Sequence, residues 1–337
     1  MKIKHDVSLK PYNTFGIDVI ASSFCNIEHV EDLRHVLKTK TTKPFFILGG
    51  GSNMLLTKNI DALVLHINIK GIKVIEETEN HVIIKANAGE NWHNLVLWCL
   101  DHNFGGIENL SLIPGNTGTA PIQNIGAYGV ELKDVFVSCE AVNVSTQSTK
   151  IFLKNECKFD YRESVFKQEL RGKYIITSVN FKLTKHNHDL HLNYGAIKNQ
   201  LEAMAIKHPN IKDVSDAVIA IRESKLPDPK DIGNSGSFFK NPVITKAQFK
   251  ALQSNFPNIP SYEISNNELK IPAGWLIEKA GFKGKRFGNF GVHSKQALVL
   301  VNYGGANGRD IFELAKLIQK TIHRLFDISI ETEVNVI

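Results

Sequence analysis

One serine in a glycine-rich segment has the neighbours that proton transfer would need. Ser237 lies within residues 233–242, which read GNSGSFFKNP, so small residues precede it and two phenylalanines follow it. Glycine lets the backbone approach a ligand closely, and aromatic rings can keep water away from a hydroxyl. Arg222 and Lys225, upstream of this segment, are cations suited to a phosphorylated substrate. The pattern predicts a proton source close to an anion-binding site.

Two further glycine-bearing loops are candidates for holding a cofactor. Residues 49–53, GGGSN, follow the apolar run 45–48, which predicts a buried strand opening into a loop of backbone amides. This loop matches neither the dinucleotide-binding nor the Walker pattern, and alone it is most simply a tight turn. Residues 114–129 combine glycines and prolines with Asn and Gln side chains, which donate and accept hydrogen bonds as a flavin ring edge requires. A self-stabilised loop is the alternative.

The composition is that of a globular chain with a small positive charge. Its 337 residues exceed what one hydrophobic core usually serves, so we expect two or three domains. Lys and Arg number 40 against 34 Asp and Glu and are scattered, which makes nucleic acid a weak alternative as a partner. We see no export signal and no apolar run of about 18 residues, so we expect a cytoplasmic protein that does not enter the membrane.

The cysteines and histidines do not form a pattern typical of a metal site. The four cysteines are widely spaced in apolar surroundings, so we expect buried, reduced thiols. Residues 186–191 hold the densest group of histidines, but no further ligand stands at the required spacing. We predict no bound metal.

Hydrophobic periodicity predicts strands and helices in irregular alternation. We expect strands at residues 72–75 and 82–88, which form a hairpin, and at 135–144, 174–183, 190–194 and 297–301. We expect helices after Asn91, at 217–222, from Thr245, from Pro272 to Gly281, and from Asp310, whose spacing to Glu313 matches a capping box. Residues 200–213 are expected to be a connector. The last helix carries an apolar stripe that predicts core packing, namely Ile311, Leu314, Ala315, Ile318, Ile322 and Leu325.

Other candidates carry little weight alone. Arg162 stands beside a tyrosine, a pattern more often found in a surface ion pair, and Tyr194 belongs to a common Asn-Tyr-Gly turn. Glu331 and Glu333 would share one face of a strand, where exposed edge charges are the simpler interpretation. Gln296 is uninformative by itself.

Taken together, six segments resemble the UDP-N-acetylenolpyruvoylglucosamine reductase family in the family's order, and the resemblance extends from residues 13–16 to Glu333. The segments are residues 49–53, 113–115 (IPG), 121–129 (PIQNIGAYG), 161–164 (YRES), 225–229 (KLPDP) and 236–242 (GSFFKNP). Residues 193–195 resemble the branch of the family that keeps a tyrosine loop.

The resemblance implies an α+β fold: a two-subdomain FAD-binding fold of the vanillyl-alcohol-oxidase type plus a smaller α+β substrate-binding domain. It places the first FAD-binding subdomain at residues 1–66, with residues 326–337 returning near it. The second subdomain is expected at residues 67–213 and the substrate-binding domain at residues 214–325.

The resemblance also implies an activity, the FAD-dependent, NADPH-driven reduction of a UDP-sugar enolpyruvyl ether to UDP-N-acetylmuramate in peptidoglycan precursor synthesis. Flavin N5 would deliver hydride to the vinyl carbon, and Ser237 would donate the proton. Arg162 and Glu333 would polarise the substrate carboxylate. The implied partners are NADPH and the UDP-sugar, without nucleic acid or membrane, and we expect a monomer.

By the same correspondence, the resemblance assigns binding residues. The expected FAD contacts are Leu48, Gly49, Gly50, Gly51, Ser52, Asn53, Met54, Pro114, Gly115, Gly118, Thr119, Gln123, Gly126 and Arg222. The expected substrate contacts are Tyr128, Tyr194, Lys225, Asn241 and Gln296. The chain departs from its relatives at Thr332 and Asn335, where Pro and Arg are common, so one cofactor contact is expected to be weaker.

Two alternatives stay open at this point. A flavin oxidase of an alcohol or lactone would use a similar FAD domain, but no histidine stands beside the glycine-rich loops for covalent attachment of the flavin. A nucleotide-sugar-binding protein without redox activity would stay colourless after reconstitution with FAD.

Overall fold

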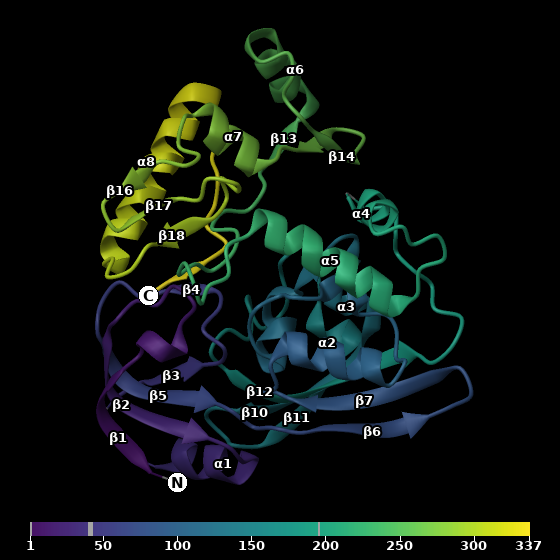
Figure 1. Cartoon of the computed structure of the whole chain (residues 1–337). Coiled ribbons are helices and arrows are strands. Elements are labelled where there is room, and N and C mark those ends of the chain that lie inside the picture. The colour runs from purple at the N-terminus through teal and green to yellow at the C-terminus, as the bar shows by residue number, and fades with distance from the viewer. Residues whose placement is uncertain (1, 40–42, 195) are drawn as a thin grey trace. The chain divides into compact units, whose positions relative to one another are not determined.

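The chain folds into two compact units, each built from helices and strands (Figure 1). The computed structural model describes residues 2–39, 43–194 and 196–337. Unit 1 comprises Met1–Val7, Ala21–Gly50 and Asp61–Ser224, and unit 2 comprises Ser8–Ile20, Gly51–Ile60 and Lys225–Ile337. The mixture of helices and strands confirms the predicted α+β class, whereas the division into three domains stays a prediction.

One strand of the first sheet of unit 1 leads directly into the first glycine-rich loop. Its strands lie in the order β1 (Ile3–Ser8), β2 (Ile20–Ile27), β5 (Ile60–Ile67) and β3 (Phe45–Leu48), with β3 parallel to β5. Helix α1 (Val30–Lys38) contributes Leu33, Val36 and Leu37 to a core shared with β5. The apolar run at residues 45–48 is therefore the predicted strand, and it delivers the chain to Gly49.

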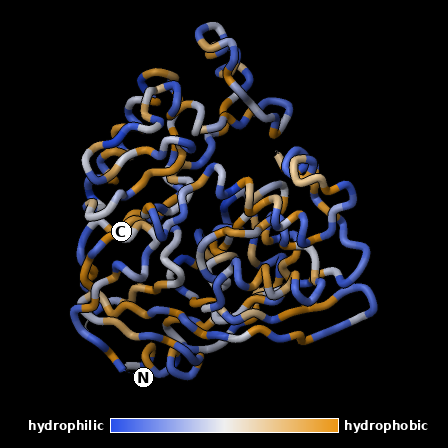
Figure 2. Tube along the Cα trace, in the orientation of Figure 1, coloured by the Kyte–Doolittle hydropathy of each residue, from blue (hydrophilic) through white to orange (hydrophobic). Residues whose placement is uncertain are grey.

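The second sheet of unit 1 contains the predicted hairpin. Its strands lie in the order β11 (Thr149–Leu153), β10 (Phe136–Asn143), β12 (Tyr174–Thr184), β7 (His81–Asn87) and β6 (Ile72–Glu77), and neighbours are antiparallel. Figure 2 shows hydrophilic residues at the β6–β7 turn and hydrophobic residues recurring along the strands. The alternation buries one face, which the structure covers with α2 (Trp92–Asp101).

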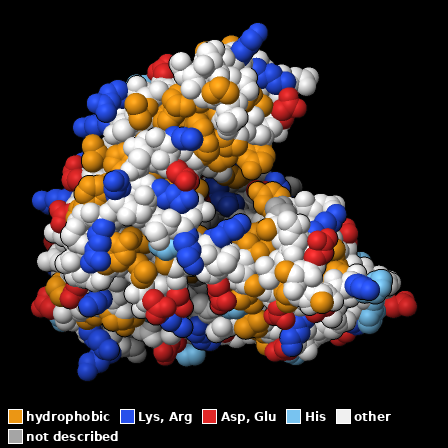
Figure 3. All heavy atoms as spheres, turned by 45° about the horizontal axis from the view of Figure 1, so that its top comes forward, with side chains coloured by type: hydrophobic (Ala, Val, Ile, Leu, Met, Phe, Trp, Pro, Cys, Tyr) orange, Lys and Arg blue, Asp and Glu red, His pale blue; other side chains and the backbone are white. Residues whose placement is uncertain are grey.

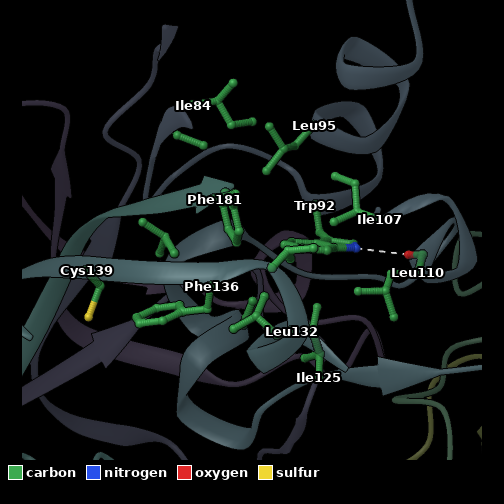
Figure 4. Close-up of a cluster of buried hydrophobic side chains, with 14 of the residues drawn as sticks. Ile84, Trp92, Leu95, Ile107, Leu110, Ile125, Leu132, Phe136, Cys139 and Phe181 are labelled. Atoms are coloured by element: carbon green, nitrogen blue, oxygen red, sulfur yellow. Dashed lines mark hydrogen bonds between the residues drawn. The ribbon is translucent and has the colours of Figure 1, made fainter. Parts of the chain in front are cut away.

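Trp92 joins α2 to the loop that follows the helix. Asn91 caps α2 as predicted, because its side chain accepts a hydrogen bond from the backbone N–H of Asn94 at 3.1 Å. The Trp92 ring is 1% exposed, and its Nε1 donates to the carbonyl of Leu110 at 2.9 Å (Figure 4). A buried Trp with its N–H satisfied stabilises the core by about 3–5 kcal/mol relative to Ala. This contact fixes the start of the second glycine-rich region.

Two predictions are wrong among the elements of unit 1 described next, which complete the part of that unit bearing on the site. They are the 3₁₀ helix η3 (Thr117–Gln123), β8 (Gly126–Ala127), β9 (Val130–Glu131), α3 (Leu132–Val135), α4 (Ile197–Ala203) and α5 (Ile211–Lys225). The connector predicted at residues 200–213 is wrong, because α4 and the first turn of α5 occupy its ends. Residues 190–194 form no strand. Ile197 and Leu201 pack against Val218 and Ile221, so tertiary packing of two short apolar patterns produces these helices.

Unit 2 consists of small sheets and three longer helices. One sheet has the strand order β13 (Val243–Thr245), β15 (Glu268–Lys270) and β14 (Tyr262–Ser265). A second sheet has the order β16 (Arg286–Phe287), β17 (Phe290–Val292) and β18 (Leu300–Asn302). In a third, β19 (Asn335–Val336) pairs in parallel with β4 (Met54–Leu55). The helices are α6 (Lys246–Asn255), α7 (Ala273–Lys279) and α8 (Gly308–Phe326), and α8 packs against β17 and β18. The pairing of β19 with β4 brings the end of the chain to residues 54–55.

The boundaries of the predicted helices in unit 2 are partly right. Helix α6 begins directly after Thr245, close to the predicted start, and Thr245 caps it through a reciprocal contact with Gln248. The capping box predicted at Asp310 is wrong, since Asn307 caps α8 by accepting from the backbone N–H of Arg309 at 2.8 Å. Leu325 is 46% exposed and Phe326 takes its place in the core, because the apolar stripe continues with a spacing of four from Ile322.

The surface charges and the cysteines bear on the expected kind of protein, a globular chain with scattered charge and reduced thiols. Lys and Arg side chains are interspersed with Asp and Glu side chains on the face that Figure 3 displays. All four cysteines are free and buried, as expected. In the part of the chain that the structure describes, no helix has both the length and the apolar character to span a membrane.

Candidate active site

The two glycine-rich loops that were predicted to bind a cofactor contact each other in unit 1. A Cβ atom on Gly50 would lie 2.8 Å from Asn116 Oδ1 and 2.9 Å from the Cα of Gly115. A Cβ atom on Gly49 would lie 2.5 Å from Cγ2 of Thr119. Side chains at these positions would push the loops apart, so the glycines are required for the approach of one backbone to the other.

The second loop forms backbone hydrogen bonds with residues 88–92, which lead into α2 and begin it. Gly118 N–H donates to the Ala88 carbonyl at 2.9 Å, and Thr117 N–H donates to the Glu90 carbonyl at 2.8 Å. At the helix start, Trp92 N–H donates to the Gly115 carbonyl at 2.9 Å. Two of the backbone positions predicted to contact the cofactor, Gly115 and Gly118, are therefore fixed by hydrogen bonds to residues 88–92, where a helix anchored in the core begins.

Arg162 is held against the far end of this loop. Its Nη2 donates to the carbonyl of Gly126 at 2.7 Å, and its own carbonyl accepts from Nζ of Lys167 at 2.9 Å. Arg162 has a left-handed backbone conformation, with φ of 56°. Such a conformation is rare outside glycine and needs support from its surroundings. The structure thus brings the predicted catalytic arginine to the predicted cofactor loop.

Tyr128, Tyr194 and Arg222 form a group in the same unit. The two tyrosine rings meet edge to face with centroids 6.4 Å apart, and Tyr194 is 58% exposed. Burial raises the pKa of Tyr128, and the positive charge of Arg222 opposes that rise. The sequence assigned these residues to different ligands, the tyrosines to the substrate and the arginine to FAD, whereas the structure places Tyr128 within the electrostatic reach of Arg222.

Arg222 itself lacks the partners that a buried cation needs. Burial lowers the pKa of its guanidinium. Although the residue keeps some exposed surface, Nε is shielded from solvent and has no hydrogen-bond partner among the described residues. No carboxylate of the described residues forms an ion pair with it. A buried charge without a counter-ion is costly, so this position fits an anionic group of a ligand.

In unit 2, the segment carrying Ser237 lies beside the C-terminal segment carrying Glu333. Glu333 N–H donates to the Phe238 carbonyl at 2.8 Å, and Phe239 forms a β-bridge with Thr332. On the other side, Ser237 forms a bridge with Val299. The two predicted catalytic residues, 96 positions apart in the chain, are therefore neighbours across a backbone pairing. Both are half-buried.

The rings that follow Ser237 are core residues. Phe238 and Phe239 are 0% and 1% exposed, and their centroids lie 5.2 Å apart. Phe15 meets Phe238 edge to face at 6.3 Å. Their burial fixes the backbone on which the serine stands, and the apolar rings remove water from one side of its surroundings.

The other predicted residues of unit 2 are held by local contacts. Gly51, at φ of 61°, leaves no room for a side chain because its Cβ would collide with the Tyr12 carbonyl. Asn53 Nδ2 donates to the Glu333 carbonyl at 3.4 Å, and Asn335 Nδ2 donates to the Asn53 carbonyl at 2.9 Å. The loop at residues 51–54 and the C-terminal segment are therefore tied together.

The predicted substrate contacts of unit 2 partly serve the fold. Asn241 Oδ1 accepts from the N–H of Ala273 at 2.9 Å at the start of α7, and Gln296 Oε1 accepts from the N–H of Leu298 at 3.4 Å. Lys225 is exposed and ends α5. Contacts of these side chains with a ligand stay a prediction.

The predicted site residues are thus divided between the units. Unit 1 holds Leu48, Gly49, Gly50, Pro114, Gly115, Gly118, Thr119, Gln123, Gly126, Tyr128, Arg162, Tyr194 and Arg222. Unit 2 holds Gly51, Ser52, Asn53, Met54, Lys225, Ser237, Asn241, Gln296 and Glu333. The sequence could not have indicated which of these residues share a unit.

Sequence reasoning missed His93. Its Nδ1 accepts a hydrogen bond from the backbone N–H of Leu112 at 3.0 Å, and the charge of Arg222 together with burial lowers its pKa. A histidine one residue after the tryptophan of α2 gave no signal, since helix periodicity alone does not show which loop the residue faces.

The histidine-rich segment offers no metal site in the structure as described. His188 Nδ1 lies 2.6 Å from Thr184 Oγ1, which accounts for one of its ring nitrogens. Across residues 2–39, 43–194 and 196–337, no group of three or more His, Cys, Asp or Glu side chains is arranged to hold a metal ion.

Comparisons with known proteins match both parts of the chain. Residues 21–150 match a family described as FAD binding domain, and residues 228–337 match the UDP-N-acetylenolpyruvoylglucosamine reductase C-terminal domain. A protein of Flavobacterium johnsoniae named UDP-N-acetylenolpyruvoylglucosamine reductase is 58% identical, with 100% of each chain covered. One of the same name from Pseudomonas aeruginosa is 45% identical, with 99% of each covered.

A solved structure shows the same fold. The crystal structure of UDP-N-acetylenolpyruvylglucosamine reductase from Thermus caldophilus superposes with a TM-score of 0.69 at 23% sequence identity. The match covers 100% of this chain and 99% of that chain.

Proposed function

The chain belongs to the UDP-N-acetylenolpyruvoylglucosamine reductase family, and on that basis we propose that it reduces the enolpyruvyl ether of a UDP-sugar to UDP-N-acetylmuramate, using FAD and NADPH. It is an oxidoreductase of peptidoglycan precursor synthesis. The backbone pairing of the Ser237 segment with the Glu333 segment supports the proposal, because it makes the segments that carry the proposed proton donor and the proposed carboxylate neighbours in unit 2.

The residues of unit 1 fit FAD. Two glycine loops in contact offer backbone groups at close range, and Arg222 offers a buried cation without a protein counter-ion for a phosphate. FAD bound here would supply the redox chemistry, the transfer of hydride from NADPH to the substrate. The members of the predicted cofactor set that unit 1 offers for this role are Leu48, Gly49, Gly50, Pro114, Gly115, Gly118, Thr119, Gln123, Gly126 and Arg222.

Ser237 acts as the general acid. After hydride arrives at the vinyl carbon, negative charge develops at the carbon that bears the carboxylate, and this carbon needs a proton. A hydroxyl is a weak acid in water but can protonate a strongly basic carbon when it is held in line and shielded. The buried rings of Phe238 and Phe239 hold the backbone at Ser237 in place.

Arg162 and Glu333 stabilise the substrate carboxylate as it becomes enolate-like. Arg162 supplies fixed guanidinium donors from a backbone conformation held by Gly126 and Lys167. Glu333 is useful beside a second carboxylate when it carries a proton or is balanced by Arg162. Tyr128, Tyr194, Lys225, Asn241 and Gln296 bind the nucleotide sugar, with Tyr194 on the tyrosine loop.

Finer features follow from the same proposal. The first FAD-binding subdomain occupies residues 1–66, with residues 326–337 returning near it. The second occupies residues 67–213, and residues 214–325 form the substrate-binding domain. The enzyme works in the cytoplasm as a monomer. The alternative readings, a flavin oxidase or a colourless nucleotide-sugar-binding protein, have no structural observation in their favour.

The experiment that tests this function separates the two half-reactions of Ser237→Ala. Anaerobic NADPH is expected to bleach the flavin of the variant at the rate of the natural enzyme. Reoxidation by the enolpyruvyl substrate is expected to slow by about 10²–10⁴-fold, because the general acid is missing. Stopped-flow absorbance of the flavin measures both steps.

The matched control is Ser294→Ala, which removes an exposed serine hydroxyl in the same unit. It is expected to leave both half-reactions unchanged. Normal turnover of Ser237→Ala would contradict the acid role, and a protein that binds no FAD would contradict the proposed function itself.

A further inference from the structure

His93 connects α2 to the entry of the second glycine-rich loop. Leu112, at φ of 58°, adopts a left-handed conformation that costs a bulky residue free energy. Its N–H donates to Nδ1 of His93 at 3.0 Å. Since Leu112 is followed by residues 113–119, the position of this N–H sets the direction in which the cofactor loop begins.

The hydrogen bond also fixes the state of the imidazole. Nδ1 can accept from Leu112 only if it carries no proton, so the proton of the neutral ring is on Nε2. Burial and, second, the charge of Arg222 both lower the pKa of His93, in the direction that keeps the ring neutral.

Helix α5 brings Arg222 to the same place. Ser215, on α5, shares a hydrogen bond of 2.7 Å between its Oγ and Oγ of Ser111, the residue before Leu112. Arg222 follows Ser215 by seven residues, about two turns, so both side chains leave α5 on the same face. The loop entry is therefore held from two helices, by His93 of α2 and by Ser215 of α5.

We propose that His93 is a positioning residue for FAD: its Nδ1 holds Leu112, and hence the loop at residues 114–119, while its uncharged ring beside Arg222 leaves that guanidinium available for a phosphate of the cofactor. A carboxylate at position 93 would neutralise Arg222, and a lysine would repel it. Histidine accepts the loop hydrogen bond without doing either. The inference rests on the proposed function, since it names FAD as the ligand.

Two substitutions of His93 distinguish the effect of its hydrogen bond to the loop from the effect of its ring. In His93→Phe the ring is kept and the acceptor is lost, whereas in His93→Asn a side-chain oxygen can replace Nδ1 as the acceptor. We expect His93→Phe to weaken FAD binding about tenfold, the value of one hydrogen bond to a constrained loop. We expect His93→Asn to stay within about threefold of the natural protein. Quenching of FAD fluorescence on titration of apoprotein gives both affinities.

A pH series gives a readout that packing alone would not move. The pKa of His93 in the folded protein is below its usual range, so the hydrogen bond is complete above the ordinary histidine pKa of about 6.5 and is lost as the pH falls through the lowered value. Arg222 of α5 is the charged group that acts on it. FAD affinity should therefore fall with acidification in the natural protein and fall less in His93→Asn, which has no proton to gain.

The controls show whether an effect is specific to FAD rather than UDP. They also show whether a negative result concerns the role of His93 or the proposed function. His102→Phe changes an exposed histidine of the residues just after α2, whose ring stacks on Trp98, and should leave FAD affinity unchanged. UDP binding by the FAD-loaded His93→Phe protein should also be unchanged. Equal FAD affinity and equal pH dependence in all the variants, or a loss of UDP affinity alone, would overturn the role of His93. A natural protein that does not bind FAD would instead overturn the proposed function.

Discussion

The cofactor region of unit 1 and the serine region of unit 2 are built in opposite ways. In unit 1 the loops meet through glycines that have no space for side chains, and most predicted contacts are backbone groups. In unit 2 the important groups are the side chains of Ser237 and Glu333, carried by segments that pair through their backbones. A diphosphate and a ring edge can be bound by many backbone dipoles, whereas protonation of one carbon needs one acid in one position.

The largest expected effect is on the chemistry of unit 2. Glu333→Ala removes the carboxylate that we propose to stabilise charge developing in the transition state, so we expect kcat to fall by about 10²–10³-fold. FAD affinity should be unchanged. Steady-state kinetics and flavin titration together measure this difference.

Glu331→Ala is the matched control for that loss. Glu331 lies two residues away on the same segment, is exposed, and pairs only loosely with Lys240 at 3.5 Å. It is expected to keep full activity. A loss of kcat as large as that of Glu333→Ala would mean that the segment, rather than the carboxylate, matters.

The loops of unit 1 should be sensitive to a single methyl group. In Gly50→Ala the new Cβ would lie 2.8 Å from Asn116 Oδ1 and 2.9 Å from the Cα of Gly115, so the loops must separate. We expect the free energy of unfolding to fall by about 1–3 kcal/mol, as overpacking does, and FAD affinity to fall with it. Chemical denaturation and flavin titration measure the two losses.

Gly274→Ala provides the comparison in α7 of unit 2, because its Cβ would meet side-chain atoms at 3.3 Å or more. It should keep both its stability and its FAD affinity. If Gly50→Ala behaved in the same way, the close approach of the two loops would not matter for binding.

Removal of the charge of Arg222 should affect binding and stability in opposite directions. In Arg222→Met, FAD affinity is expected to fall by about 10- to 100-fold, since a charged hydrogen bond to phosphate is lost. The apoprotein should be as stable or more stable, because a buried cation without a counter-ion is removed. Thermal unfolding of apoprotein and flavin titration test both parts.

Arg34→Met is the control for that substitution. Arg34 also lies in unit 1 and also has a buried Nε without a hydrogen-bond partner among the described residues, but its Nη2 donates to Thr149 Oγ1 at 2.6 Å, a residue outside both glycine loops. FAD affinity should not change. A stability loss in apo Arg222→Met would show that the guanidinium has a structural partner.

The smallest expected effect concerns the C-terminal segment. Asn335→Ala removes the hydrogen bond from Nδ2 to the Asn53 carbonyl at 2.9 Å, which is exposed, so we expect a loss of about 0.5–1 kcal/mol in unfolding free energy. An unchanged midpoint of denaturation would mean that the backbone pairing of β19 with β4 suffices.

Local signals predicted the elements whose ends are defined by neighbouring residues. Asn91 caps a helix as expected, α6 begins beside Thr245 as expected, and the β6–β7 hairpin follows from alternation and a polar turn. Failures occurred where tertiary packing decides. Helix α4 exists because Ile197 and Leu201 pack against α5, and Asn307 rather than Asp310 caps α8 because the helix already begins at Gly308, which is buried against the backbone of Leu56.

The sequence by itself determined the family, through short motifs in a fixed order, and with it the residue types that the chemistry requires. Only the tertiary structure decided which of those residues stand together: Arg162 with Gly126, Arg222 with Tyr128, and Ser237 beside Glu333. It also revealed His93, which no motif marks. The physical reason is that motifs record local backbone needs, whereas burial, counter-ions and backbone pairing depend on segments far apart in the chain.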